Sequence, residues 1–304
     1  MKIALGTAQF GLDYGISNQQ GKVNIPEVTN ILEQALSLGI DTLDCAGAYG
    51  DSEAVLGKLG ASKRFNLISK IPALSIEQNT ITQFFEQSLN NLKSDSLDTM
   101  LFHQAENLIE HPNKLQLFTQ LALLKKQKLI KNIGVSVYSP EQLKIIAESF
   151  PIDTAQVPVN IFDQRFLSPN VMQLCSDKKI KLHARSIFLQ GLLFIEEEKL
   201  SPYFEPYKNK LKAFNALAKH LSCTKLTLAL AIALLAKRLT YKTCKEEESS
   251  YCFEKLVIGV CSTKQLIEVV NAYEQVNQLR ITNEELYSLA DTRLGFINPS
   301  QWVV

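Results

Sequence analysis

The sequence predicts a single α/β domain folded as a closed (β/α)8 barrel, and three observations support this prediction. Eight short apolar segments are separated almost throughout by segments with the periodicity of amphipathic helices. Such alternation is typical of a parallel sheet, and eight units of this kind fit a chain of 304 residues. The alternative is an open doubly wound sheet, which usually carries a GxGxxG turn after its first strand. Gly6, Gly11 and Gly15 do not have that spacing.

The predicted strands are short apolar runs, several of which end in a polar residue. They cover residues 2–9, 40–44, 65–70, 98–103, 130–136, 153–157, 180–186 and 255–260. The predicted helices have apolar residues three and four positions apart, and the first of them has clear end signals. Asn24 and Pro26 open it and Gly39 ends it. The helices cover residues 24–39, 51–59, 81–92, 113–126, 140–149, 170–176, 207–220, 224–239, 263–274 and 283–293.

Composition and charge exclude several classes of function. Hydrophobic residues make up 46% of the chain, which is enough for a large core. Lysine and arginine number 32 against 31 acidic residues, so neither nucleic acid nor a membrane surface is an expected partner. The most apolar stretch, residues 226–236, is too short to span a bilayer and is interpreted as a buried helix. With no signal-peptide pattern and no CxxC among six cysteines, the expected location is a reducing cytoplasm.

A polar run at residues 241–255 precedes the last predicted strand. We interpret it as a surface insertion within one domain that covers residues 1–304. Cys244 and Cys252 lie in this run, but neither a histidine nor a CxxC pair accompanies them. Surface thiols are therefore favoured over metal ligands, and no metal site is predicted.

Four polar side chains lie at or just after the ends of three consecutive predicted strands. Asp44, Lys70 and His103 each end a strand, and Tyr49 lies in the loop that follows Asp44. In a (β/α)8 barrel the C-terminal ends of the strands converge on one face, where active sites lie. The sequence therefore predicts that all four side chains project into one cavity.

These four residue types suit proton transfer. The pKa of a free tyrosine is about 10, and a neighbouring ammonium group lowers it by stabilising the phenolate. A carboxylate can hold that lysine in place, and a histidine can share the proton or orient a substrate oxygen. On this basis Tyr49 is expected to have a lowered pKa.

The set Asp44, Tyr49, Lys70 and His103 resembles the catalytic tetrad of the aldo-keto reductases. The segments GTAQFGLDYG, TLDCAGAYGDSEAVLG, LISK, LFH, IGVS and QVPVN resemble sequence blocks of that family, in the family's order and over nearly the whole chain. The short form resembles family members from bacterial sugar-modification loci, which implies a sugar-derived carbonyl as one candidate substrate. The resemblance implies a hydride transfer from NAD(P)H to the carbonyl group of a small molecule, with Tyr49 as general acid. Lys70 would then lower the Tyr49 pKa, Asp44 would pair with Lys70, and His103 would bind the carbonyl oxygen or relay the proton.

The same resemblance implies cofactor contacts after four strands. Ser136 and Gln156 match positions that hold the nicotinamide carboxamide, and Asn160 matches a downstream family asparagine. The further positions are Arg185, Ser186, Gln190 and Gly191 after the seventh strand, and Gly259, Cys261, Ser262, Lys264 and Gln265 after the eighth.

Three departures from the family pattern affect these contacts. Val137 replaces an asparagine, and Arg185 stands where an aromatic ring usually stacks on the nicotinamide. After the eighth strand Lys264 is the only cation available for a 2′-phosphate. The family norm implies NADP(H), and this departure brings NAD(H) within reach.

Two alternatives to carbonyl reduction remain open from the sequence. One is a non-redox lyase or epimerase that uses the same acid–base set, and the other is a non-catalytic regulatory subunit that binds the cofactor. The substrate and the oligomeric state are not specified. We also expect His111 to be solvated and His183 to pack inside the barrel, and we expect Phe162 and Phe166 to form a substrate wall or to cap the barrel.

Overall fold

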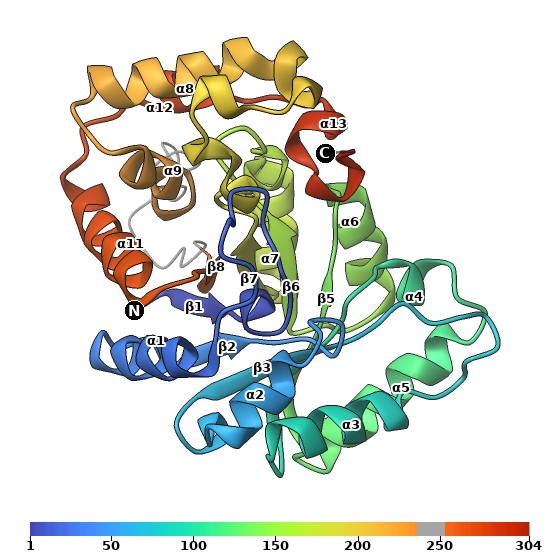
Figure 1. Ribbon diagram of the computed structural model, residues 1–304. Coiled ribbons are helices and arrows are strands. Elements are labelled where there is room, and N and C mark those ends of the chain that lie inside the picture. Colours follow the sequence, from blue (N-terminus) through green and yellow to red (C-terminus); the bar gives the residue numbers. More distant parts are fainter. Residues whose placement is uncertain (236–252, 304) are drawn as a thin grey trace.

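The chain folds as a closed barrel of eight parallel strands with helices around the outside, as the sequence predicts (Figure 1). The computed structural model describes residues 1–235 and 253–303. The strands follow one another around the barrel in sequence order, and β8 closes it against β1, with Gly6 opposite Gly259. The strands are β1 Ile3–Gly6, β2 Thr42–Asp44, β3 Asn66–Ile71, β4 Leu97–Phe102, β5 Ile130–Ser136, β6 Thr154–Pro158, β7 Lys181–Arg185 and β8 Lys255–Gly259.

Each predicted helix has a counterpart among the described residues, and the end signals read from the sequence operate as expected. The Asn24 side chain accepts a hydrogen bond from the Glu27 backbone N–H, with Pro26 in the first turn of α1. The α-helices are α1 Ile25–Ser37, α2 Ser52–Lys58, α3 Thr82–Leu92, α4 Glu106–Ile109, α5 Lys114–Lys126, α6 Pro140–Ser149, α7 Pro169–Lys178, α8 Lys208–His220, α9 Lys225–Leu234, α11 Thr263–Gln275, α12 Asn283–Ser288 and α13 Leu294–Ile297.

The chain beyond α12 departs from the prediction of one helix over residues 283–293. The backbone N–H of Asp291 donates to Phe162 O at 2.9 Å, and the Asp291 carboxylate pairs with Arg293 at 2.6 Å. These contacts with the loop after β6 replace the next helical turn. As a result the C-terminal segment turns back over the barrel mouth through α13, near the C-terminus in Figure 1.

Helices α8 and α12 lie side by side at one end of the view in Figure 1. Lys210 on α8 donates through Nζ to Ser288 O at 3.1 Å and to Ala290 O at 2.7 Å. A lysine at the C-terminal end of a helix is favourable there because it meets carbonyl groups that lack helical partners. This contact helps to fix the segment that leads to the barrel mouth.

One expectation outside the candidate site was wrong, and the structure decides between the two alternatives left open for Phe162 and Phe166. His111 is buried rather than solvated, because Nε2 contacts Ser75 O at 2.9 Å and Nδ1 accepts from Asn113 N at 3.1 Å. The Phe162 ring is fully buried against Phe296, with ring centroids 4.7 Å apart, so it belongs to the core that covers the barrel. Phe166 is likewise fully buried and does not line the cavity.

Most of the predicted insertion at 241–255, including Cys244 and Cys252, lies outside the described residues. Its last three residues are described and do not belong to a surface loop, because Phe253 is fully buried and Lys255 begins β8. His183 is buried, as expected, and contacts Glu254 at 3.1 Å.

No single helix among the described residues has both the length and the apolar character needed to cross a membrane. The pair Pro202–His220 and Lys225–Leu234 passes by length and composition only when joined, and it bends by 96°. The apolar character of α9 is explained by its place in the protein interior, where residues 227–233 are all buried.

Candidate active site

A large cavity opens at the C-terminal ends of the strands and contains three of the four proposed catalytic side chains. Its volume is about 1070 Å³, and Asp44, Tyr49 and His103 are among the residues that line it. Lys70 lies behind this wall and is completely buried. The backbone explains the grouping, because β2 ends at Asp44 and the β3 residue Lys70 lies one position from the end of its strand.

Asp44 and Lys70 form a buried ion pair. Lys70 Nζ donates to Asp44 Oδ2 at 2.8 Å and to the Cys45 carbonyl oxygen at 2.7 Å. The second Asp44 oxygen, Oδ1, accepts from Gln156 Nε2 at 2.8 Å. Burial alone would lower the pKa of Lys70, but the negative charge of Asp44, and that of Tyr49 once it ionises, outweigh burial and raise that pKa. Lys70 is therefore an ammonium group throughout the neutral range.

Tyr49 is held at the cavity wall by a close approach between two loops. A Cβ atom on Gly11 would lie 1.9 Å from the Tyr49 carbonyl oxygen, so only glycine allows this approach. The Tyr49 hydroxyl lies 3.4 Å from Lys70 Nζ, which is a long contact for a hydrogen bond. The ammonium group also lies 4.9 Å from the centre of the Tyr49 ring.

The sequence-based expectation of a lowered Tyr49 pKa was wrong. The side chain is half-exposed as a whole, but its hydroxyl is enclosed, and loss of water raises the pKa of Tyr49. The Lys70 charge opposes this increase without overcoming it. The hydroxyl therefore keeps its proton at neutral pH.

His103 directly follows β4, and its ring faces Tyr49 in the loop after β2. Its backbone N–H donates to Ile71 O at 2.8 Å, so the sheet ladder continues one residue past β4 and fixes the backbone. The two rings meet edge to face, with centroids 5.8 Å apart and planes at 84°. Burial lowers the pKa of His103 to about 4, assisted by the charges of Lys70 and Arg185. The imidazole is therefore neutral at pH 7 and has one N–H to donate.

The proposed nicotinamide contacts also line the cavity, but each already has a protein partner. Gln156 donates to Asp44, as described above. Ser136 Oγ accepts from Arg185 Nε at 3.2 Å, and the Arg185 guanidinium lies 4.3 Å from the centre of the Tyr138 ring. Asn160 does not reach the cavity. It is fully buried, and its Oδ1 accepts from the backbone N–H groups of Phe162 and Asp163, so it caps a turn.

The loop after β7 forms one side of the cavity in a strained conformation. Ser186, Leu189 and Gln190 have φ values of 61°, 48° and 52°, which are uncommon for residues with side chains. Gly191 has φ 89°, and a Cβ atom there would lie 1.7 Å from Ser17 Oγ. Clustered strain of this kind is typical of loops that bind ligands.

The segment after β8 contributes Gly259, Cys261 and Gln265 to the cavity wall, but not Lys264. Lys264 has 85% of its side chain exposed and lies 4.0 Å from Glu268. Ser262 caps α11 by accepting from Gln265 N at 3.2 Å, and it lines a smaller hollow beside the main cavity. The cation expected after β8 therefore points away from the cavity.

A carboxylate at the start of α11 was not predicted from the sequence. Glu27, from α1, accepts a hydrogen bond from the Thr263 backbone N–H at 2.6 Å. This bond lowers the pKa of Glu27, so a negative charge lies where a helix would otherwise attract an anion. Residues 27 and 263 are too far apart in sequence for any local pattern to reveal the contact.

Other cavity residues were also missed by the sequence reasoning. Tyr14 and Tyr138 come from loops, and the C-terminal segment closes the wall with Asn298, Pro299 and Ser300. Only the turn of the chain after Ala290 brings that last segment to the mouth.

The cavity is large enough for a dinucleotide. Tyr49 and His103 line it together with Cys261 and Gln265, and its volume of about 1070 Å³ lies slightly above the usual range for ligand sites. Polar groups with hydrogen-bonding capacity are part of its wall, and the strained loop after β7 borders it.

Comparison with known proteins gives a family match over nearly the whole chain. Residues 2–284 match the model of the Aldo/keto reductase family. Oxidoreductase YdhF of Escherichia coli (strain K12) is 27% identical over 206 residues, which are 61% of this chain and 66% of that protein. Uncharacterized oxidoreductase YqkF of Bacillus subtilis (strain 168) is 24% identical over 314 residues, 95% of each chain. Aldo-keto reductase YhdN of the same strain is 28% identical over 63% of this chain and 60% of its own.

Solved structures show the same fold. The holo form of aldo-keto reductase AKR11C1 from Bacillus halodurans superposes with a TM-score of 0.73 at 18% identity, covering 95% of this chain and 92% of the other. The thermostable aldo-keto reductase Tm1743 gives a TM-score of 0.67 at 20% identity, covering 95% and 94%. At these identities the likeness supports the (β/α)8 TIM-barrel fold.

Proposed function

This chain belongs to the aldo/keto reductase family, and from that membership we propose that it reduces an aldehyde or ketone to an alcohol with NAD(P)H. The observation that carries the proposal is the meeting of the Asp44–Lys70 ion pair, the Tyr49 hydroxyl and the neutral His103 at a cavity large enough for a dinucleotide.

Tyr49 is the proposed general acid. Burial keeps the proton on its hydroxyl at neutral pH, so the acid is ready when the substrate arrives. As negative charge grows on the carbonyl oxygen, Tyr49 donates this proton and becomes a phenolate. The Lys70 ammonium, 3.4 Å away, stabilises the phenolate.

Asp44 and Gln156 position this acid through Lys70. Asp44 accepts a hydrogen bond from the lysine amine at one carboxylate oxygen and from Gln156 at the other. The Asp44 side chain therefore has little freedom to rotate. His103, being neutral, donates one N–H to the carbonyl oxygen and orients it toward Tyr49.

The bound cofactor supplies the hydride that adds to the carbonyl carbon. Ser136, Gln156 and Arg185 would hold its nicotinamide end. The loop with Ser186, Gln190 and Gly191 would flank the pyrophosphate, and Gly259, Cys261 and Gln265 would line the adenosine end.

For the choice of cofactor, we propose NADP(H) binding with weak selectivity and use of NAD(H) as well. The family norm favours NADP(H). Two features of this chain oppose a strong preference. Lys264 is exposed outside the cavity, and the Glu27 carboxylate accepts a hydrogen bond from Thr263 N–H, the first backbone donor of α11.

The decisive test is oxidation of NADPH and of NADH by the purified chain across a panel of aldehydes and keto-sugars. Turnover that consumes reduced cofactor supports the proposal. Turnover of a sugar with the cofactor retained and unconsumed would instead indicate a lyase or epimerase. Cofactor binding without turnover on any member of a broad panel would favour a regulatory subunit.

A further inference from the structure

Within the described part of the chain, Arg185 is a fixed guanidinium group without a carboxylate partner. Its Nε donates to Ser136 Oγ at 3.2 Å, Nη1 to Ser186 Oγ at 3.1 Å, and Nη2 to the Val137 carbonyl oxygen at 3.1 Å. All three acceptors are neutral. A guanidinium carries five N–H donors, so two remain after these three bonds.

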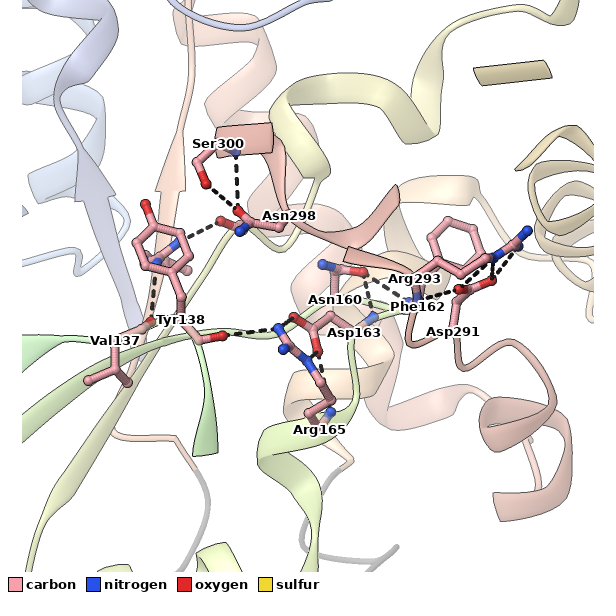
Figure 2. Close-up of polar contacts among 12 residues, drawn as sticks. Val137, Tyr138, Asn160, Phe162, Asp163, Arg165, Asp291, Arg293, Asn298 and Ser300 are labelled. Carbon is pink, nitrogen blue, oxygen red and sulfur yellow. Dashed lines mark hydrogen bonds and ion pairs between the residues drawn. The ribbon is translucent and has the colours of Figure 1, made fainter. Parts of the chain in front are cut away.

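The Tyr138 ring that packs against Arg185 is itself held in place. The guanidinium stacks on the Tyr138 ring, and the loop that carries Tyr138 is anchored at both backbone groups. Tyr138 N donates to Gln142 Oε1 at 2.7 Å, and Tyr138 O accepts from Arg165 Nη2 at 3.1 Å. Figure 2 shows this second contact and the buried Asp163 that pairs with Arg165. The cation is therefore preorganised, which reduces the entropy cost of binding a ligand.

The charges around Arg185 do not balance. Asp44 is paired with Lys70, and His103 is neutral at pH 7. The other acid in the cavity wall, Glu268, lies near Lys264 on α11. Among residues 1–235 and 253–303, no acidic side chain forms an ion pair with Arg185. The catalytic end of the cavity therefore carries a net positive charge.

Arg185 shares the cavity with the proposed catalytic groups and acts on one of them electrostatically. It lines the same cavity as Tyr49 and His103, and its charge contributes to the lowered pKa of His103. A half-buried guanidinium with two free donors is suited to a carboxylate or a phosphate, which it can bind through two oxygens.

We propose that Arg185 binds an oxyanion on the substrate, so that the enzyme prefers carbonyl compounds that carry a carboxylate or phosphate group. This inference rests on the proposed carbonyl reduction and adds the substrate class. A charge-assisted contact of this kind improves affinity by about tenfold to a hundredfold over a neutral analogue.

The test compares matched pairs of charged and neutral aldehydes at fixed ionic strength. Succinic semialdehyde against butanal tests the carboxylate, and glyceraldehyde 3-phosphate against glyceraldehyde tests the phosphate. We expect the wild type to prefer one or both charged compounds by about tenfold or more in kcat/KM. In Arg185→Gln the ratio of charged to neutral kcat/KM should approach one, mainly through KM. Arg185→Lys should retain part of the preference because it keeps a point charge.

A binding measurement separates a substrate role from a cofactor role. The alcohol products of the two charged substrates are 4-hydroxybutanoate and 3-phosphoglycerol. Calorimetry measures the binding of each product to the cofactor-saturated wild type and to both variants. The dissociation constant of the cofactor alone is measured in parallel. Lys225→Gln is the matched control, because Lys225 is another cation in the cavity wall that lies near Glu196 at 4.0 Å. Its ratio of charged to neutral substrates should match the wild-type ratio.

The proposal is overturned if Arg185→Gln leaves the charged-to-neutral ratio unchanged, whether or not cofactor binding weakens. It is also overturned if wild type shows no preference for either anion. Failure of the proposed function has a different signature, namely no cofactor oxidation with any member of the panel, and the product titrations still test Arg185 in that case. Thermal unfolding of each variant checks the fold, and Arg185→Lys keeps the test valid if the glutamine variant is unstable.

Discussion

Lys70 Nζ lies 2.8 Å from Asp44 Oδ2, and both side chains are almost completely removed from solvent. Substituting either partner leaves an unpaired charge in the protein interior. We expect Lys70→Met to lower the free energy of unfolding by about 3–5 kcal/mol, because Asp44 then lacks its counter-charge. Urea unfolding at pH 7 measures this difference. The double variant Lys70→Met/Asp44→Asn should recover part of the loss, and no recovery would mean that the pair is not coupled.

Tyr49→Phe removes the proposed acidic proton and keeps the ring. Loss of a general acid should reduce kcat by about 10²–10⁴-fold, with little change in the cofactor dissociation constant. Steady-state kinetics and a fluorescence titration of reduced cofactor measure the two quantities. Tyr14→Phe is the matched control, since Tyr14 lines the same cavity without contacting Lys70, and it should cost far less. Near wild-type turnover in Tyr49→Phe would assign the acid role to another group.

His103 makes stability depend on pH. Its folded pKa of about 4 lies below the ordinary value of 6.5, so the unfolded chain binds a proton more tightly than the folded chain does. The stabilising contribution is complete above about pH 6.5 and is lost as the pH falls from there toward 4. Wild type should therefore lose more stability between pH 7 and pH 5 than His103→Gln does. Chemical unfolding at both pH values tests this, and equal losses would contradict the lowered pKa.

Glu27→Gln tests the choice of cofactor. The amide keeps an acceptor for the Thr263 N–H and removes the negative charge. We expect the affinity for NADP(H) to rise relative to NAD(H) by roughly two- to fivefold, as for a partly exposed charge interaction. Titration of both cofactors at fixed salt measures the ratio. Lys264→Ala should leave the ratio nearly unchanged, because Lys264 points away from the cavity. A large loss of NADP(H) selectivity in Lys264→Ala would show that this lysine turns inward when cofactor binds.

Local signals in the sequence were sufficient for the architecture and for placing Asp44, Lys70 and His103 at or near the ends of successive strands. The apolar periodicity gave the strands and helices, and Asn24, Pro26 and Gly39 marked the limits of α1 because caps act within one turn. Asp44, Lys70 and His103 could be brought together from sequence alone because parallel strands of a closed barrel all point their C-terminal ends to the same face.

The electrostatics and the outer wall of the site depend on contacts between residues that are distant in the sequence. The Tyr49 pKa is raised because enclosure of the hydroxyl outweighs the Lys70 charge, and burial cannot be read from residue types. Glu27 contacts Thr263, although most of the chain separates them in sequence. The segment with Ser300 lies at the cavity mouth because Asp291 contacts the loop after β6 and turns the chain. The groups at the strand ends can be identified from the sequence alone, because their positions follow from local periodicity. The distances, charges and loop contacts that tune these groups come from residues distant in sequence, and only the packed chain brings them together.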